Sequence, residues 1–228
     1  MQYKILFIHS IFSSGLSSLN RSFERIPEID YVQQERFNGI SDINYKYLKN
    51  KISKRKAKDL LKDIFTYREN VSTVVEICVR SSALINIQYE LFPNSKFLWW
   101  IRDGRNVVRT QYSQHFCKWL FDLESESTFL KYCEQWNKIN TTIETQFLSL
   151  PSYVKKGPVK LEENKSLLPI LKWWGIHTEA EGQLLHYHKT HAHEIPKWTY
   201  WDKKMKDKAK QYLNPYLKKA GYIYNENW

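Results

Sequence analysis

The chain has 228 residues, of which 42% are hydrophobic, and its 35 Lys and Arg residues against 24 Asp and Glu residues give a formal charge of +11. This length and composition fit one globular domain over residues 1–228 and exclude collagen-like and largely disordered proteins. The charge favours an anionic partner, but no helix-turn-helix, zinc-finger or RNP motif accompanies it, so we expect no nucleic acid.

The first half of the chain alternates short apolar runs with segments of helical spacing. In chain order these predict a strand at 3–8, a helix from 17 to before Pro27, a strand at 30–33, a basic helix at 46–67, a strand at 72–79, a helix at 83–92 and a strand at 96–102. Strands that alternate with helices in this way are typical of an α/β sheet with right-handed crossovers.

The second half of the chain is mostly helical in pattern. It predicts helix over 106–150 with a polar interruption at 122–128, a short strand at 158–161, a helix at 167–174 closed by Gly175, a surface segment or lid at 179–196, and a final helix at 203–219. We therefore expect an α/β fold with a central parallel sheet of about four or five strands, flanked by helices on both faces.

Two stretches carry most of the positive charge. Residues 46–62 hold eight basic residues against Asp59, and residues 197–219 hold eight against Asp202 and Asp207. Such runs are usually solvated helix faces, although the first of them could also guide an anionic sugar.

The apolar runs and the cysteines bear on the compartment. The longest strongly apolar runs, 5–8 and 97–101, are far shorter than the roughly 20 residues that cross a bilayer. The apolar run near the N-terminus is too short for the apolar region of a signal peptide. The three cysteines have no CxxC spacing. We therefore expect a cytoplasmic protein with reduced thiols and no transmembrane segment.

Residues 7–19 run from the first predicted strand through a Ser- and Gly-rich turn into a helix. Such a turn surrounds an anion with backbone N–H groups and a helix dipole. The candidate binding residues are Ser13, Ser14, Gly15, Leu16, Ser17 and Ser18. The turn lacks the Gly-Lys-Ser/Thr end of a Walker A loop, which disfavours an ordinary ATPase or GTPase. A turn that only caps its helix is the alternative interpretation.

A second motif, FPNSKFLWWIRDGRNVVRT, occupies residues 92–110. An Arg at the carboxyl end of a strand and a hydroxyl in the next helix, here Arg102 and Thr110, can hold one phosphate between them. A surface ion pair between Arg102 and Asp103 is the alternative. The segment closely resembles the 3′-phosphate-binding segment of sulfotransferases that use 3′-phosphoadenosine 5′-phosphosulfate (PAPS). In that resemblance Arg102 and Thr110 bind the 3′-phosphate, and Gly104 replaces the usual Pro, which only frees the turn.

The resemblance implies a nucleotide-kinase-like sulfotransferase fold and makes the first turn the 5′-phosphosulfate loop. The family's Arg or Lys in that loop falls on Ser13. Either another cation fills its role, or the enzyme is slow or inactive toward PAPS. The candidates for the relocated cation are Arg21, Arg36 and Arg80, of which Arg80 lies in a stretch that resembles an Arg-Ser segment of bacterial relatives.

Sulfuryl transfer needs a base for the acceptor proton, and no metal. Glu35 is the first candidate, because the resemblance places a catalytic Glu at this position, although a surface ion pair is its alternative role. His115 is the second candidate and His9 the third. Weaker similarities to the family extend to residues 157–163 and 218–222.

Two further sets of residues have a possible role. A zinc-dependent hydrolase is a weak alternative suggested by the run His186, His188, His191 and His193. We expect no metal, because no HExxH motif or similar carboxylate motif supports the run. Tryptophans that could line an acceptor pocket are Trp119, Trp136, Trp198 and Trp201.

The sequence thus predicts a PAPS-dependent sulfotransferase that sulfates a hydroxyl of a carbohydrate or small-molecule acceptor and releases 3′-phosphoadenosine 5′-phosphate (PAP). Because Ser13 replaces the basic loop residue, a catalytically inactive module that binds PAP or a nucleotide is the alternative. A kinase-like phosphotransferase is a weaker one, since it would need a basic loop residue and a magnesium-binding carboxylate after a strand.

Overall fold

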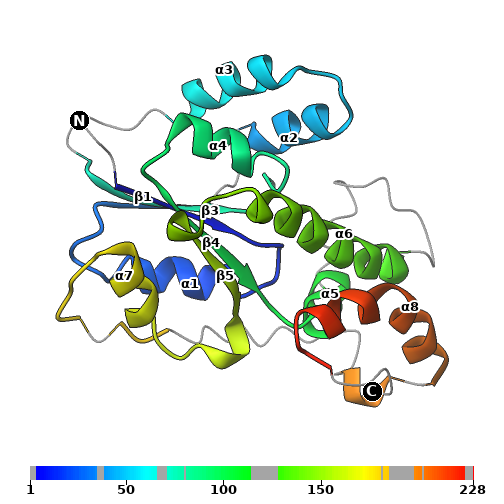
Figure 1. Cartoon of the computed structure of the whole chain (residues 1–228). Helices are drawn as coiled ribbons and strands as arrows, with labels where there is room; N and C mark the ends of the chain where they lie inside the picture. Colours follow the sequence, from blue (N-terminus) through cyan, green and yellow to red (C-terminus); the bar gives the residue numbers. More distant parts are fainter. Residues whose placement is uncertain are drawn as a thin grey trace.

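The computed structural model describes residues 4–34, 39–65, 71–79, 81–113, 128–180, 182–184, 198–201, 203–223 and 228. Five strands form one parallel sheet in the order β2-β3-β1-β4-β5 (Figure 1). They are β1 (Lys4–His9), β2 (Tyr31–Gln34), β3 (Thr73–Cys78), β4 (Lys96–Ile101) and β5 (Lys155–Lys160). The predicted α/β fold with four or five parallel strands is confirmed.

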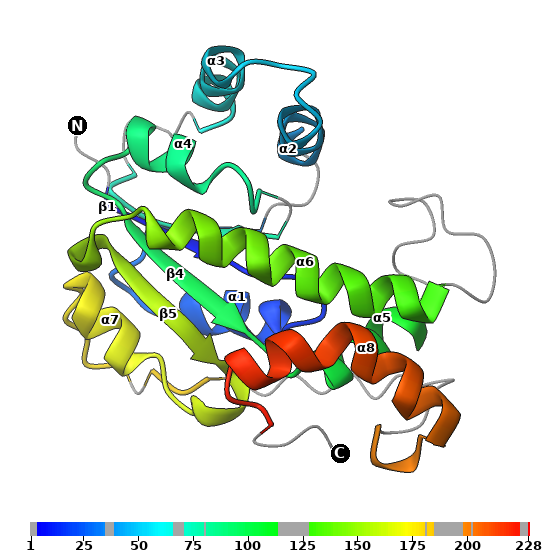
Figure 2. The same cartoon turned by 45° about the vertical axis from the view of Figure 1, so that its right-hand side comes forward.

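Helices cover both faces of this sheet (Figures 1 and 2). The α-helices are α1 (Leu16–Phe23), α2 (Ile40–Leu48), α3 (Lys54–Ile64), α4 (Ile85–Leu91), α5 (Gly104–Ser113), α6 (Thr128–Leu148), α7 (Leu168–Trp174) and α8 (Lys203–Lys219). Short 3-10 helices are η1 (Ser152–Val154), η2 (Leu161–Glu163) and η3 (Trp198–Tyr200). α1 and α7 lie on one face, and α2, α3, α4 and α6 on the other. α8 packs along α6, beyond the carboxyl end of β4.

The two faces of the sheet bury separate cores, because successive strand residues point to opposite sides. On β1, Leu6 joins the core under α1 and α7, whereas Phe7 stacks on Phe97 in the other core, with ring centres 5.2 Å apart. Trp99 and Trp100 of β4 divide between the cores in the same way. Burial on both faces explains why the central strands are apolar without a break.

The single basic helix predicted at 46–67 is wrong, because α2 and α3 replace it. Between them Asn50 has a φ of 53°, and the Ser53 hydroxyl caps α3 by accepting a hydrogen bond from Lys56 N at 3.2 Å. Asn tolerates a left-handed backbone and Ser favours the N-cap. These two local signals end one helix and start the next, even though the helical spacing of apolar residues continues through the segment between them.

The other predicted elements are present with shifted ends. The final helix at 203–219 is confirmed, and Gly175 ends α7 with a φ of 78°. The last strand begins earlier than predicted, and α5 begins at Gly104. Residues 114–127 and 185–197, which include the predicted interruption and most of the predicted lid, lie outside the described residues. Within the described ranges, no helix is long and apolar enough to cross a membrane.

Candidate functional site

The turn between β1 and α1 lies at the carboxyl edge of the sheet and has an unusual backbone. Ser13 has a φ of 66° and Gly15 a φ of 78°. A Cβ atom on Gly15 would lie 2.8 Å from Leu161 Cδ2, so a larger residue would have to displace Leu161. Gly15 is the N-cap of α1 and has no side chain to cap it. The N-terminus of α1 therefore presents the electropositive end of its helix dipole, with no capping side chain from Gly15 in front of it, and such a helix end favours an anion.

Three side chains, from β4, from the segment directly after it and from α5, donate hydrogen bonds to carbonyl groups of this turn. The hydrogen bonds are Trp100 Nε1 to Ser14 O at 3.0 Å, Arg102 Nη1 to Ser13 O at 2.7 Å, and Gln111 Nε2 to Phe12 O at 3.1 Å. Since the carbonyl oxygens are satisfied by protein donors, the electropositive N–H groups of the turn remain for a ligand. The predicted phosphate loop and the predicted phosphate-binding Arg are thus in direct contact.

Two guanidinium groups lie close together at this edge. Burial lowers the pKa of Arg102, the carboxylates of Glu162 and Asp103 raise it, and the positive charge of Arg109 lowers it again. Burial also lowers the pKa of Arg109. Two half-buried cations that repel each other are stabilised by an anion between them. Arg109 was not among the residues predicted from the sequence, although it directly precedes Thr110.

Residues 102–105, which we call the elbow, turn the chain from β4 into α5. The Asp103 carboxylate caps α5 by accepting a hydrogen bond from Arg105 N at 2.9 Å, and it forms a bidentate pair with the Arg105 side chain. Both side chains of this pair are less than 10% exposed. The Arg105 guanidinium stacks on Trp198, 4.0 Å from the ring centre. The alternative of an Arg102–Asp103 surface pair is therefore wrong, because Asp103 is buried and engaged with Arg105.

Gly104 has a packing role that the sequence did not reveal. A Cβ atom at this position would lie 2.6 Å from the Trp136 ring, so Gly104 does more than free the turn. Trp136 is fully buried and donates a hydrogen bond from Nε1 to Arg102 O at 3.2 Å. The prediction of a pocket wall is wrong for Trp136 and for Trp201, which is 3% exposed, because both belong to the core.

The structure places Thr110 in the second turn of α5, between Arg109 and Gln111. Its hydroxyl donates a hydrogen bond to Asn106 O at 2.8 Å and keeps its capacity to accept one. Its contact with a phosphate stays a prediction. Leu16 and Ser18 of the predicted loop are buried, whereas Ser17 is exposed.

Several buried polar atoms at this edge have no hydrogen-bond partner among the described residues. They are the hydroxyls of Ser10, Ser14 and Ser81 and the Oε1 atom of Gln111. The residues follow β1 and β3 or lie in α5, so they belong to the same edge as the turn. A buried polar group without a partner destabilises a fold by about 1–3 kcal/mol. Atoms of this kind fit a ligand rich in phosphate oxygens and hydroxyl groups.

Other predicted site residues lie away from the turn between β1 and α1, or fall outside the described residues. Arg21 is exposed in the last turn of α1, away from the turn that precedes the helix. His9 is fully buried against Phe97 and Phe147, and burial lowers its pKa to about 3. It is therefore a neutral core residue, and its proposed role as a base is wrong. The predictions outside the described residues are Glu35, Arg36, Arg80, His115, Trp119 and the histidines from 186 to 193.

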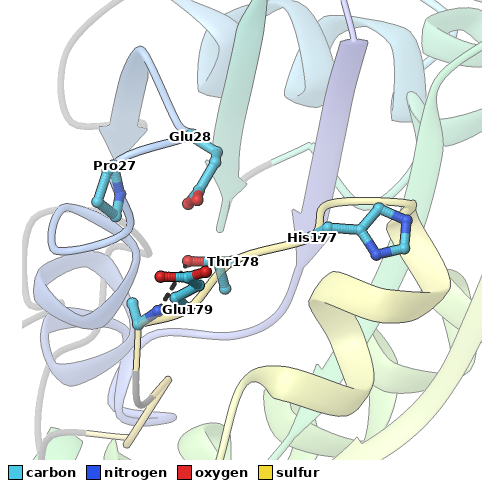
Figure 3. Close-up of a pocket in the computed structure, with 6 residues that line it drawn as sticks. Pro27, Glu28, His177, Thr178 and Glu179 are labelled. Atoms are coloured by element: carbon cyan, nitrogen blue, oxygen red, sulfur yellow. Dashed lines mark hydrogen bonds between the residues drawn. The ribbon is translucent and has the colours of Figure 1, made fainter.

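A hollow of about 540 Å³ lies at the opposite, amino edge of the sheet (Figure 3). Its lining residues are Pro27, Glu28, His177, Thr178, Glu179 and Ala180. The carboxylates give it the wrong charge for a phosphate. Among the residues with described positions, no three His, Cys, Asp or Glu side chains form a group that could hold a metal ion.

Comparison with known proteins bears on the fold. No family model and no curated protein matches this chain. Among solved structures, a sulfotransferase from Alicyclobacillus acidocaldarius superposes with a TM-score of 0.62 at 13% identity, over 97% of this chain and 95% of that one. The sulfotransferase domain from the curacin biosynthetic pathway has a TM-score of 0.49 at 16% identity, over 79% and 76% of the two chains. Retinol dehydratase, solved with androsterone and the inactive cofactor PAP, has a TM-score of 0.47 at 13% identity, over 98% and 83%. The similarity to the Alicyclobacillus acidocaldarius structure, with its TM-score of 0.62, shows that the chain has a sulfotransferase fold.

Proposed function

We propose that this chain transfers a sulfuryl group from PAPS to a hydroxyl of a carbohydrate or small-molecule acceptor. The observation that carries the proposal is the 2.7 Å hydrogen bond from Arg102 Nη1 to the carbonyl oxygen of Ser13. It joins the cation at the end of β4 to the anion-binding turn before α1. A ligand with two separate phosphate positions, as in PAPS, matches this pair of neighbouring elements, and the fold supports the same class of ligand.

In this proposal each element at the carboxyl edge has a defined task. The turn and the N-terminus of α1 hold the 5′-phosphosulfate through backbone N–H groups and the hydroxyls of Ser14, Ser17 and Ser18. Arg102 and Thr110 hold the 3′-phosphate, and the charge of Arg109 adds to their field. PAPS supplies the sulfuryl group, whose bond to the phosphate oxygen breaks as the acceptor oxygen bonds to sulfur, so that PAP leaves. Positioning and charge stabilisation are then the work of the chain.

The acceptor hydroxyl must also lose its proton. Glu35 is the proposed base and His115 the second candidate. β2 ends at Gln34 on the carboxyl edge of the parallel sheet, where the turn also lies. A carboxylate that follows this strand end is suited to a base in the same site. No metal ion is needed for this chemistry.

The turn itself has no Lys or Arg, and this favours a module that binds PAP without catalysis as the second candidate function. A cation near the bridging oxygen stabilises charge that develops in the transition state. In the proposed enzyme, this cation is one of Arg36, Arg80 or Arg109. We expect Ser13→Arg to leave turnover flat or lower if one of them already fills the role, and to raise turnover if none does.

Calorimetry and turnover together separate these candidates. We expect PAP to bind more tightly than ATP, and labelled PAPS to release PAP in the presence of sugar or phenol acceptors. Tight PAP binding without turnover, and without rescue by Ser13→Arg, would favour the binding module. Equal or tighter binding of ATP, with transfer of its phosphate, would instead favour a phosphotransferase.

A further inference from the structure

Glu162 is a carboxylate that reaches the elbow from another part of the fold. It lies in η2, directly after β5. Its Oε1 accepts a hydrogen bond from Asp103 N at 3.0 Å, and its Oε2 accepts one from Tyr222 OH at 3.0 Å. One side chain therefore connects the end of β5, the elbow and the turn after α8.

The donors to Glu162 are neutral, so its negative charge is not cancelled by them. A backbone N–H and a phenol bind its two oxygens, and burial together with this carboxylate raises the pKa of Tyr222 above the ordinary range, so the phenol keeps its proton. Among the described residues, a second acid that acts on Arg102 is Asp103, whose carboxylate is paired with Arg105. Glu162 and Asp103 both act on Arg102, and of the two Glu162 has the larger effect and no cationic hydrogen-bond donor on its oxygens.

The position of Arg102 depends on the same contacts. The peptide group between Arg102 and Asp103 is held at both of its polar atoms. Its carbonyl oxygen accepts a hydrogen bond from Trp136 Nε1, and its N–H group donates one to Glu162. The guanidinium of Arg102 then reaches Ser13 O. A phosphate that binds Arg102 enters the field of Glu162, which attracts the guanidinium and repels the phosphate.

We propose that Glu162, although exposed at the surface, is a positioning residue and counter-ion for Arg102, which holds the elbow through Asp103 N and weakens the binding of anions at the Arg102 guanidinium. This inference rests on the proposed role of Arg102 in binding the 3′-phosphate. If the role of Glu162 were purely structural, substitutions at this position would weaken ligand binding or leave it unchanged. If Glu162 acts as a counter-ion, removing only its charge should instead strengthen ligand binding.

Glu162→Gln provides this test, because the amide oxygen still accepts the bond from Asp103 N while the charge is lost. We expect PAP to bind about fivefold more tightly at low salt, with a steeper loss of affinity as salt is added. Inorganic sulfate should raise the melting temperature more in the variant than in the original chain. Adenosine 5′-monophosphate, which lacks the 3′-phosphate, should bind with unchanged affinity.

Glu163→Gln is the matched control, since it makes the same change in net charge one residue away. Both residues are exposed, but the Glu163 carboxylate pairs with Lys160 at 2.8 Å, whereas Glu162 accepts its hydrogen bonds from Asp103 N and Tyr222 OH. We expect Glu163→Gln to leave PAP and sulfate binding unchanged. Equal tightening in both variants would show a general charge effect and overturn the inference.

Tyr222→Phe tests the same role from the opposite direction, because it keeps the Glu162 charge and removes only the phenol donor. A carboxylate that has lost this donor acts more strongly on Arg102, so PAP binding should weaken by about twofold. Unchanged or tighter binding in this variant, or unchanged or weaker PAP and sulfate binding in Glu162→Gln, would overturn the inference.

The failure of this inference and the failure of the proposed function look different. If the original chain prefers PAP to adenosine 5′-monophosphate and Glu162→Gln leaves that preference unchanged, the function stands and the counter-ion role fails. If no variant prefers PAP but Glu162→Gln binds sulfate more tightly, the counter-ion role stands and the function fails.

Discussion

The positive charges at the carboxyl edge of the sheet and those on α3 differ in their surroundings. Arg102 is half-buried, donates a hydrogen bond to Ser13 O, and has its pKa lowered by burial. Lys54 at the start of α3 has a side chain that is 54% exposed and pairs with Glu90, a contact that raises the pKa of Lys54. Arg102 and Lys54 each count as one positive charge in the formal net charge of +11.

The comparison teaches that the location of a cation matters more than the total charge. Around Lys54, water and salt screen the charge, and a neighbouring carboxylate already neutralises it. Around Arg102, the lower effective dielectric strengthens any interaction with an anion. We therefore expect ligand binding and catalysis to depend on the carboxyl edge, and α3 to contribute little to either.

The largest expected effect is on catalysis at this edge. Glu35→Gln keeps the shape of the proposed base and removes its proton acceptor, so turnover of PAPS with an acceptor should fall by about 10²–10⁴-fold. PAP affinity, measured by calorimetry, should barely change. Glu90→Gln is the control on the α3 side and should leave turnover intact. Near-normal turnover in Glu35→Gln would assign the base to His115.

The next effect is on cofactor binding. Arg102→Ala removes the half-buried guanidinium, which in the proposed function is the partner of the 3′-phosphate. We expect a loss of about 2–4 kcal/mol in the free energy of PAP binding, as for other desolvated charge pairs that lose one member. Calorimetry measures this loss, and circular dichroism checks the fold. A folded variant with unchanged PAP affinity would contradict the assignment.

His9 sharpens the comparison, because it ends β1 at the same edge but points into the core. Its pKa is about 3 in the folded chain against an ordinary value of 6.5, so the unfolded chain binds the proton first as the pH falls. The free energy of unfolding should therefore decrease below about pH 6.5, by about 1.4 kcal/mol per pH unit from this residue alone. Urea unfolding at several pH values measures this dependence. The free energy of unfolding should change less steeply with pH in His9→Leu than in the original chain. An equal slope in both chains would contradict the buried neutral His9.

The smallest effect is expected on α3. Lys54→Ala removes one exposed ion pair, so the free energy of unfolding should change by less than about 1 kcal/mol. PAP affinity and turnover should stay the same. A loss of PAP binding as large as that of Arg102→Ala would break the comparison and make α3 part of the binding surface.

The sequence by itself determined the class of fold and located the segments that form the candidate site. Alternating apolar runs and helical segments predict a parallel α/β sheet, because each signal is local and follows the period of its element. The segment around Arg102 is recognisable for the same reason: its strand, elbow and helix are contiguous in the chain. Ser13 and its neighbours are identified as a candidate anion-binding turn because only a few Ser and Gly residues separate the predicted strand from the start of the next helix.

Only the tertiary structure decided which side chains meet at the elbow. The partner of Asp103 is Arg105 rather than Arg102, Gly104 is required by the Trp136 ring, and Glu162 reaches Asp103 N from beyond β5. These contacts join residues from different elements, so no local pattern predicts them. The burial of His9 likewise depends on rings brought from β4 and α6. Periodicity specifies which face a residue occupies, whereas its partners on that face are set by how the elements pack together.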